Sequence, residues 1–294
     1  MRRSVAVLAV AAGAAVAVWT GMTADGHLRR TVHPEDPGGG GRRAVTVAKA
    51  PEFDALRLRG GLRAYLRGRP GRAGVMATDL RSGRTFGLNE TSQFVTASVI
   101  KVDILAALLL QHQWQGVGLS EGERALAGRM IRRSDNTAAD ALYAGIGRND
   151  GLRRAGQMFG LERTDPYPVS WGSSWTSPSD QVRLIRSLAS DPSPLAPANR
   201  RYVLRLMRSV IPAQAWGISA AARPGERVAL KNGWVPLRYE GNGWAVNSIG
   251  RITGPGHDFL VAVFSCDSPT MGEGVATVEH VATAVVSALR GTDG

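Results

Sequence analysis

A serine and a lysine three residues apart give the first sign of chemistry. Ser98 and Lys101 stand in the run Ser98-Val99-Ile100-Lys101, directly before an apolar stretch with helical periodicity. Residues at i and i+3 of a helix share one face, so the hydroxyl and the amine are expected side by side. A serine hydroxyl is a weak nucleophile alone. A lysine can activate it when burial or a second cation lowers the amine pKa from about 10.4 toward neutrality.

The use of lysine is itself informative. Of 36 lysines and arginines in the chain, only Lys49, Lys101 and Lys231 are lysines. An ammonium group can lose its proton, whereas a guanidinium group effectively cannot, so lysine in an arginine-rich chain indicates proton transfer. Lys231 opens the run Lys231-Asn232-Gly233-Trp234, at the end of a strand-like segment. It is expected to be the second cation.

A third polar cluster, Ser134-Asp135-Asn136, stands before a helical segment. Short polar side chains also cap helices, so this triplet alone is compatible with a structural role. The run at Lys231 is likewise compatible with a glycine-marked strand end whose lysine points to water. The order of the clusters is more specific than any one of them: Ser-x-x-Lys, then Ser-Asp-Asn, then Lys-x-Gly.

In this order the sequence resembles the class A β-lactamases and related penicillin-binding serine hydrolases, over residues from about 52 to about 290. The resemblance implies that Ser98 forms an acyl-enzyme, that Lys101 takes its proton and that Ser134 relays a proton to the leaving nitrogen. It implies substrate contacts from five residues: Asn136, Lys231, Asn232, Gly233 and Trp234. The backbone N–H groups of Ser98 and Trp234 would form the oxyanion hole.

Besides the shortened helical lobe, two positions of the candidate site depart from the family pattern. Asn232 stands where threonine or serine is usual, and an amide can still donate to a carboxylate but with a different reach. The loop after Gly160 lacks the glutamate that activates the deacylating water in efficient β-lactamases. Without gaps, Asp165 falls at that position and is the candidate deacylation base. The alternative is that Asp165 is a turn residue before Pro166.

The remaining elements predict an α+β protein of the β-lactamase and transpeptidase type. A five-stranded antiparallel sheet lies beneath helices from both chain ends, and a shortened helical lobe is inserted between the strands. The helix over 54–67 offers Leu56, Leu58, Leu62 and Leu66 for burial. Strands are predicted at 74–80, 85–91, 227–234, 244–253 and 259–266, with a helical block at about 94–209 and an amphipathic helix at the end.

The N-terminal region predicts export. Residues 1–24 contain two arginines and an apolar run from Val5 to Trp19, typical of a signal peptide or signal anchor. Residues 25–50 are rich in glycine and proline and predict a flexible linker, followed by the hydrolase domain at 51–294. The protein is therefore expected to be extracellular, or membrane-tethered and facing the cell wall. The single cysteine, Cys266, excludes an internal disulfide, and no metal or other cofactor is expected.

The net charge is +12, but the basic residues are scattered along the sequence and not interleaved with aromatics, so no nucleic-acid partner is expected. The expected ligand is a β-lactam or a peptidoglycan peptide bound by a monomer, with membrane contact only through the N-terminal segment. Three functions stay open: hydrolysis of β-lactams or related amides, a slowly deacylating D-Ala-D-Ala carboxypeptidase or esterase, and a non-catalytic cell-wall-binding module.

Overall fold

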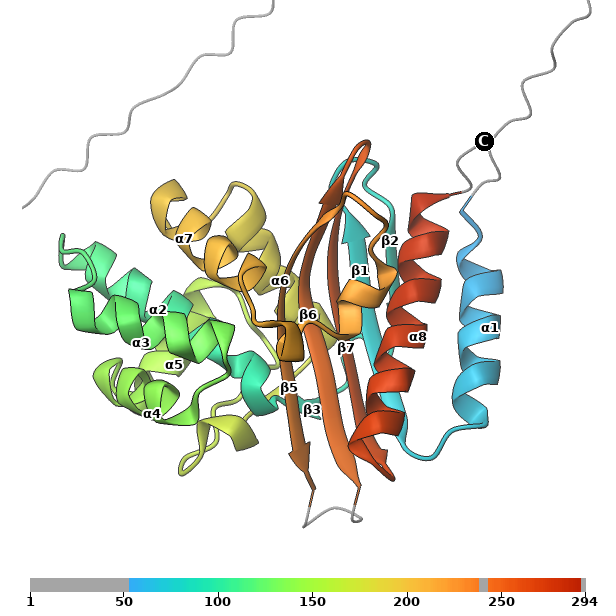
Figure 1. Ribbon diagram of the computed structural model, residues 1–294, viewed down its shortest axis with the longest axis horizontal. Coiled ribbons are helices and arrows are strands. Elements are labelled where there is room, and N and C mark those ends of the chain that lie inside the picture. The colour runs from blue at the N-terminus through green and yellow to red at the C-terminus, as the bar shows by residue number, and fades with distance from the viewer. Residues whose placement is uncertain (1–52, 238–242, 292–294) are drawn as a thin grey trace, which may run out of the picture. The chain divides into compact units, whose positions relative to one another are not determined.

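A five-stranded antiparallel sheet forms the centre of the protein (Figure 1). The computed structural model describes residues 53–237 and 243–291, so the predicted signal segment 1–24 and linker 25–50 lie outside the described residues. The strand order is β2-β1-β7-β6-β5. The strands are β1 (Arg72–Asp79), β2 (Thr85–Leu88), β5 (Arg227–Pro236), β6 (Trp244–Gly254) and β7 (His257–Ser268).

Two helices from opposite ends of the described chain cover one face of the sheet (Figure 1). Helix α8 (Met271–Arg290) buries a stripe that includes Val278, Val281 and Val285 against the strands, as its amphipathic pattern predicts. Helix α1 (Ala55–Arg67) packs on α8 and buries only Leu62 fully. The expectation that Leu56 is available for burial is wrong, because Leu56 is 81% exposed on the outer side of α1.

The other face of the sheet carries the helical lobe (Figure 1). Its central helix is α2 (Lys101–Trp114), in which every residue from Lys101 to Leu110 is buried, as expected for a helix that is almost uniformly apolar. The other helices of the lobe are α3 (Glu121–Arg132), α4 (Asn136–Gly145), α5 (Arg148–Met158), α6 (Pro178–Ala189) and α7 (Pro197–Arg208).

A long loop between α5 and α6 is closed at its neck by Asp180. This buried carboxylate accepts hydrogen bonds from the backbone N–H groups of Glu162 and Arg163 and from the Thr164 hydroxyl. Ser177 caps α6 by accepting from the Asp180 backbone N–H. Within the loop, the short strand β4 (Trp175–Thr176) pairs with β3 (Phe94–Val95). The loop is thereby attached to the segment that leads into Ser98.

The predicted fold class, α+β with a five-stranded antiparallel sheet, is confirmed. Strand β2 ends at Leu88, earlier than predicted, because Asn89 adopts a left-handed backbone conformation with φ of 51°. None of the helices in the described ranges is both long and apolar enough to cross a membrane. The same residues contain no cluster of three or more His, Cys, Asp or Glu side chains suited to a metal ion.

Candidate active site

Ser98 lies at a corner between the sheet and the helical lobe. It belongs to the short 3-10 segment η1 (Ala97–Ile100), which runs directly into α2. The preceding residue, Ala97, is buried and has φ of +45°, a conformation that costs energy in a non-glycine residue. The buried amide of Asn247 on β6 holds this corner by donating to the carbonyls of Val95 (2.9 Å) and Thr96 (3.1 Å).

Gly233 brings the edge strand β5 against the backbone of Ser98. A Cβ atom at position 233 would lie 2.7 Å from the Ser98 nitrogen and 2.8 Å from the Val99 nitrogen. Such separations are shorter than van der Waals contact, so only glycine permits this approach. The Lys-x-Gly motif and the Ser-x-x-Lys motif are therefore in direct contact through main-chain atoms.

Two buried lysines meet at the hydroxyl of Ser134. Lys101 Nζ lies 3.2 Å from Ser134 Oγ, and Lys231 Nζ lies 3.0 Å from the same oxygen. Ser134 follows α3 and has φ of +59°, so it is a second strained non-glycine residue at this site. The structure thus joins all three motifs, although they are spread over more than a hundred residues of sequence.

Burial changes the proton affinity of both amines. It lowers the pKa of Lys101 from 10.5 to about 8, while the carboxylates of Asp135 and Asp140 act in the opposite direction. Burial also lowers the pKa of Lys231 well below its usual range, and the neighbouring Lys101 charge adds to that effect. A neutral amine, which can accept a proton, is therefore accessible near physiological pH.

The hydrogen bonds of Lys101 define where its lone pair can point. Its amine donates to the Ser134 carbonyl and to Asn136 Oδ1, both at 2.7 Å, and its third neighbour is Ser134 Oγ. A neutral amine that donates to both carbonyl oxygens keeps one lone pair for a hydroxyl. Among the described residues the Ser98 hydroxyl makes no hydrogen bond, so its predicted link to Lys101 is not formed here.

An indole from the long loop covers Lys101. The Trp171 ring lies with its centroid 4.8 Å from Lys101 Nζ, and Trp171 Nε1 donates to Asp140 Oδ1 at 2.7 Å. Asn136, Asp140, Tyr143 and Trp171 also line a hollow of about 410 Å³ beside the amine. In the described part of the chain, no carboxylate contacts Lys101 directly.

Two predicted site residues lie elsewhere. The Asp165 side chain is 72% exposed, and its nearest ionic partner is Arg153 at 3.7 Å. Its backbone pairs with Trp175, and among the described residues its carboxylate makes no contact with Lys101 or Ser134, so its role as deacylation base stays a prediction that no contact supports. Asn232 is fully buried, and its amide donates to the carbonyls of Gln214 and Trp216. Its donors are therefore not available to a substrate carboxylate.

Strand geometry explains the position of Asn232. Successive side chains of a strand point to opposite faces, so Lys231 and the Cα of Gly233 face Ser98 and Ser134 while Asn232 points away. The Trp234 side chain also points away and packs edge-on against Trp216, which leaves its backbone as the part relevant to the site. Because β5 is an edge strand of the described sheet, backbone N–H groups on its outer edge are unpaired, as the predicted oxyanion donor at Trp234 requires.

Three residues of this site escaped the sequence reasoning: Asn247, Trp171 and Asp140. Asn247 follows the apolar residues Trp244, Ala245 and Val246 in a predicted strand, and this polar residue was a usable signal. Trp171 and Asp140 lie in a loop and on a helix surface, where no periodicity marks them. Only the fold brings them next to Lys101.

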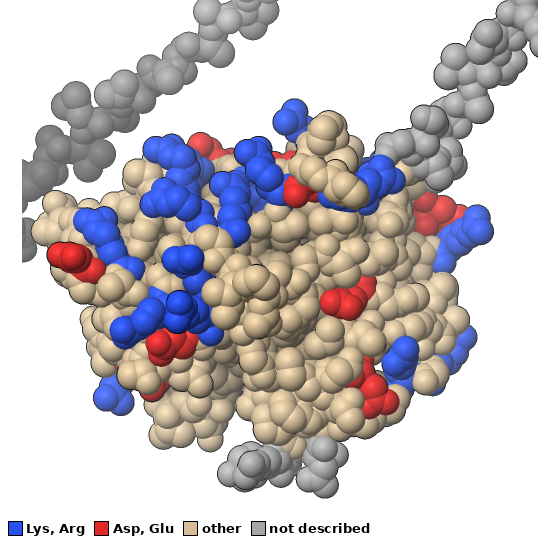
Figure 2. Space-filling view, in the orientation of Figure 1, with Lys and Arg blue, Asp and Glu red and all other residues tan. Residues whose placement is uncertain are grey.

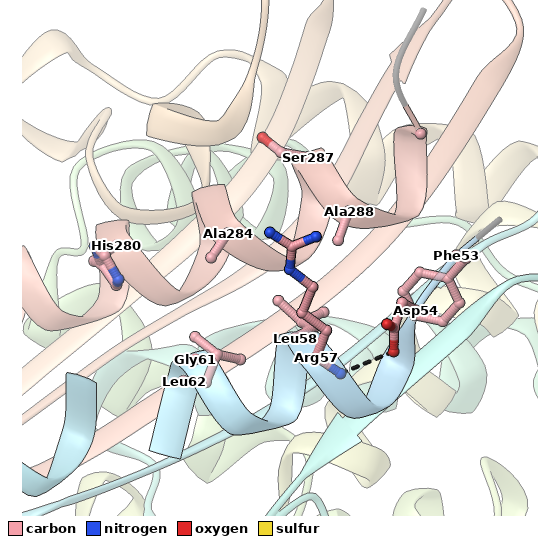
Figure 3. Close-up of a pocket in the computed structure, with 11 residues that line it drawn as sticks. Phe53, Asp54, Arg57, Leu58, Gly61, Leu62, His280, Ala284, Ser287 and Ala288 are labelled. Carbon is pink, nitrogen blue, oxygen red and sulfur yellow. Dashed lines mark hydrogen bonds between the residues drawn. The ribbon is translucent and has the colours of Figure 1, made fainter. Parts of the chain in front are cut away.

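A second hollow, of about 530 Å³, lies between α1 and α8 (Figure 3). It is mainly apolar, with Arg57, His280 and Ser287 among its lining residues. Its histidine stacks on Tyr65, and among the described residues no hydrogen bond joins His280 to Ser287. This hollow therefore lacks a paired nucleophile and base, in contrast to the cluster around Ser134.

The two-lobed fold, with its three motifs joined at one corner, defines a protein of the β-lactamase type. Residues 57–123 and 113–289 match the sequence model of the Beta-lactamase enzyme family. The chain belongs to this family. The resemblance predicted from the motifs is thus confirmed at the level of the family.

Solved structures support the same fold. The chain superposes on the TLA-1 extended-spectrum β-lactamase with a TM-score of 0.72 at 18% identity, covering 80% of this chain and 99% of that one. It superposes on a PBP-A mutant, determined as an acyl-enzyme complex with penicillin G, with a TM-score of 0.69 at 23% identity, covering 80% and 97%. For the class A β-lactamase from Mycobacterium abscessus the TM-score is 0.67 at 22% identity, covering 78% and 98%.

Curated relatives exist in mycobacteria. The protein named "Putative lipoprotein LppW" in Mycobacterium tuberculosis and in Mycobacterium bovis is 28% identical over 200 residues, which is 65% of this chain. The chain spans 62% of the length of these relatives.

Proposed function

We propose that the protein is a serine hydrolase that forms an acyl-enzyme at Ser98 and releases it slowly. One observation carries this proposal: Lys101, one helical turn after Ser98, and Lys231 are both buried and share the Ser134 hydroxyl, and no carboxylate among the described residues contacts Lys101. The first part favours formation of the acyl-enzyme. The second part disfavours its hydrolysis.

Acylation needs a base, an oxyanion site and a proton for the leaving group. In the proposed reaction Ser98 Oγ attacks the amide carbonyl carbon while its proton passes to the neutral Lys101 amine. The oxyanion accepts hydrogen bonds from the backbone N–H groups of Ser98 and Trp234, and losing one such donor typically costs about 3 kcal/mol. As the C–N bond breaks, the Ser134 hydroxyl gives its proton to the nitrogen and regains one from a lysine. The product is an ester at Ser98.

The missing contact between Ser98 and Lys101 is compatible with this scheme. Catalytic hydrogen bonds in unliganded enzymes are often long or misaligned and tighten only when substrate binds. Lys101 currently uses Ser134 Oγ as its third neighbour. In the proposed reaction the Lys101 amine exchanges that neighbour for the Ser98 hydroxyl.

Hydrolysis of the ester needs a second base to activate water. The Trp171 ring occupies the space over Lys101 from which a loop carboxylate would act, and Asp140 is already engaged by the indole N–H. We therefore favour a penicillin-binding protein whose physiological ligand is a peptidoglycan peptide. The PBP-A mutant that was determined as an acyl-enzyme complex with penicillin G supports this assignment by analogy.

We also propose that the protein is exported. The apolar run between Val5 and Trp19 and the lipoprotein designation of the mycobacterial relatives support this location. A cell-wall peptide would be accessible only there.

A fluorescent penicillin tests the reaction. The full chain is expected to acquire one covalent label, detected by intact mass and by gel fluorescence, and to keep it during a chase with unlabelled penicillin. Ser98→Ala should remain unlabelled, because the nucleophile is absent. A chain that never acquires the label would be a non-catalytic wall-binding module, and labelling of Ser98→Ala at the same rate would exclude the assigned nucleophile.

A further inference from the structure

Arginine side chains from two helices of the helical lobe line one groove. The groove consists of two adjoining hollows, of about 350 and about 580 Å³, which share Arg124 and Tyr202. Figure 2 shows the corresponding concentration of basic side chains over the part of the surface where Figure 1 places α3 and α7. The lining arginines are Arg124, Arg129, Arg132 and Arg133 from α3 and its end, and Arg201 and Arg205 from α7.

Helical spacing produces this arrangement. Arg124 and Arg132 are eight residues apart with Gly128 midway, so all three lie on one face of α3. Arg201 and Arg205 are four residues apart on the facing side of α7. Gly128 leaves the floor between the arginines open, since nothing lies within 4 Å of its potential Cβ. The expectation that the basic residues are merely scattered is therefore wrong: they are distant in sequence but close in space.

Carboxylates neutralise little of the charge of this groove. Among the residues that the structure describes, no acidic side chain lines either hollow. Of the six lining arginines only Arg129 forms an ion pair, with Asp135 at 3.3 Å. A concave surface with one sign of charge concentrates ligands of the opposite sign. Guanidinium groups are suited to phosphate oxygens, which they bind through two parallel hydrogen bonds.

We propose that this arginine groove binds an extended phosphodiester glycopolymer of the cell envelope. Two connected hollows with separate arginines match a chain of repeated phosphates better than a single anion. A single-stranded nucleic acid requires exposed aromatic rings for base stacking, and here Tyr202 is half-buried with the Arg205 guanidinium 5.2 Å from its ring centroid. A membrane surface requires several inserted apolar side chains, and among the described lining residues Val117 is the only large one that is exposed.

The groove ends next to the candidate active site. Arg132 and Arg133 immediately precede Ser134, whose hydroxyl is shared by the two buried lysines. A polymer bound along α3 would therefore keep the enzyme beside the wall material that carries its peptide substrate. The choice of an envelope polymer rests on the proposed function, whereas the preference for phosphate rests on the groove alone.

Binding of a labelled poly(glycerol phosphate) oligomer tests the proposal by fluorescence anisotropy on the full chain. Arg124→Gln/Arg201→Gln/Arg205→Gln removes three charges from the groove without touching a described ion pair. Its dissociation constant should rise at least about tenfold, and added salt should weaken binding to the unmodified chain more steeply than to this variant. The matched control Arg57→Gln/Arg63→Gln/Arg67→Gln removes the same charge from α1, on the opposite face of the sheet, and should keep the original affinity.

Two further measurements separate this proposal from the proposed function. The groove variant should still acquire the penicillin label, and Ser98→Ala should still bind the polymer. Equal loss of affinity in the groove and α1 variants would overturn the assignment, because binding would then depend only on total charge. The assignment would also be overturned if a single-stranded oligonucleotide bound more tightly than the polymer. It would likewise be overturned if the groove bound phosphatidylglycerol vesicles in preference to phosphatidylcholine vesicles but did not bind the polymer.

Discussion

Lys101 and Lys231 approach one oxygen, the Ser134 hydroxyl, to 3.2 and 3.0 Å. Two ammonium groups that share an acceptor in the protein interior repel each other, and each has also lost its hydration. The pair therefore titrates as a unit, with apparent pKa values that belong to both amines. This relationship converts two strongly basic side chains into acceptors and donors of protons at moderate pH.

The first prediction concerns the pH dependence of acylation. In the proposed reaction Lys101 must be neutral to accept the proton, and burial lowers its pKa to about 8. The rate of labelling by penicillin should therefore rise as pH increases toward about 8 and become constant above it. Stopped-flow or gel-based rates between about pH 6 and about pH 10 measure this profile. The labelling rate of Lys101→Arg should be lower by about a hundredfold or more, since its guanidinium stays charged. A labelling rate of the unmodified chain that does not change with pH would contradict a neutral lysine base.

The second prediction concerns the contact between Gly233 and Ser98. In Gly233→Ala the new methyl group must displace the backbone nitrogens of Ser98 and Val99, now 2.7 and 2.8 Å from its position. The labelling rate should fall about a hundredfold, and overpacking should destabilise the fold by about 1–3 kcal/mol. The control is Gly60→Ala on α1, where nothing lies within 4 Å. Similar labelling rates in the two variants would show that the close approach of β5 has no role in acylation.

The third prediction concerns release of the acyl group. Trp171→Glu places a carboxylate where an indole now covers Lys101 at 4.8 Å. A base at this point can activate water for attack on the ester, so loss of label in the chase should accelerate at least about tenfold. Trp171→Gln has a similar shape without the charge and should remain slow. Asp165→Asn should leave release unchanged, because that carboxylate is exposed and its ionic partner is Arg153. Faster release by the glutamine variant would attribute the effect to loss of the indole alone.

The fourth prediction concerns a buried carboxyl group in α2. Burial raises the pKa of Asp103 from 3.8 to about 7, and its Oδ2 has no hydrogen-bond partner among the described residues. In the unfolded chain the group ionises near its usual pKa. Folding therefore takes up a proton between about pH 4 and pH 7, and this contribution to stability decreases as pH rises through that range.

Asp103→Asn should remove that dependence. At pH 8 the variant is expected to be more stable than the unmodified chain by about 1–3 kcal/mol, and near pH 5 the difference should shrink. Urea unfolding at the two pH values measures the change. The exposed residue Asp165 provides a control, since Asp165→Asn should change the free energy of unfolding at neither pH. An equal gain at both pH values would mean that ionisation of Asp103 does not cause the difference.

Much of the fold was predictable because each element obeys a local rule. The stripe at Val278, Val281 and Val285 defines α8, and the proline after Ser177 marks the start of α6. The exposure of Leu56 was not predictable from periodicity alone. A helix that packs against one neighbour buries fewer leucines than its sequence contains. The hydrophobic pattern of a helix and its actual burial differ where the helix lies at the periphery of the fold, as α1 does.

The candidate site was predictable where spacing and chemistry coincide. Lys101, Ser134, Asn136 and Lys231 are joined by hydrogen bonds, and Ser98 lies one helical turn before Lys101 with its backbone against Gly233. A gapless alignment puts Asp165 at the position of the base, but such an alignment cannot follow a loop whose path is fixed elsewhere, by the hydrogen bonds that Asp180 accepts. The basic groove was missed because α3 and α7 are separated by more than sixty residues in sequence and meet only in the folded lobe.

The first and last described residues, Phe53 and Gly291, line the same hollow between α1 and α8. Both positions are on the side of the sheet opposite the helical lobe. A dye, affinity handle or solid support joined near either of them would therefore leave Ser98 and the arginine groove facing the solution. Surface-based kinetic measurements can use both points of attachment interchangeably.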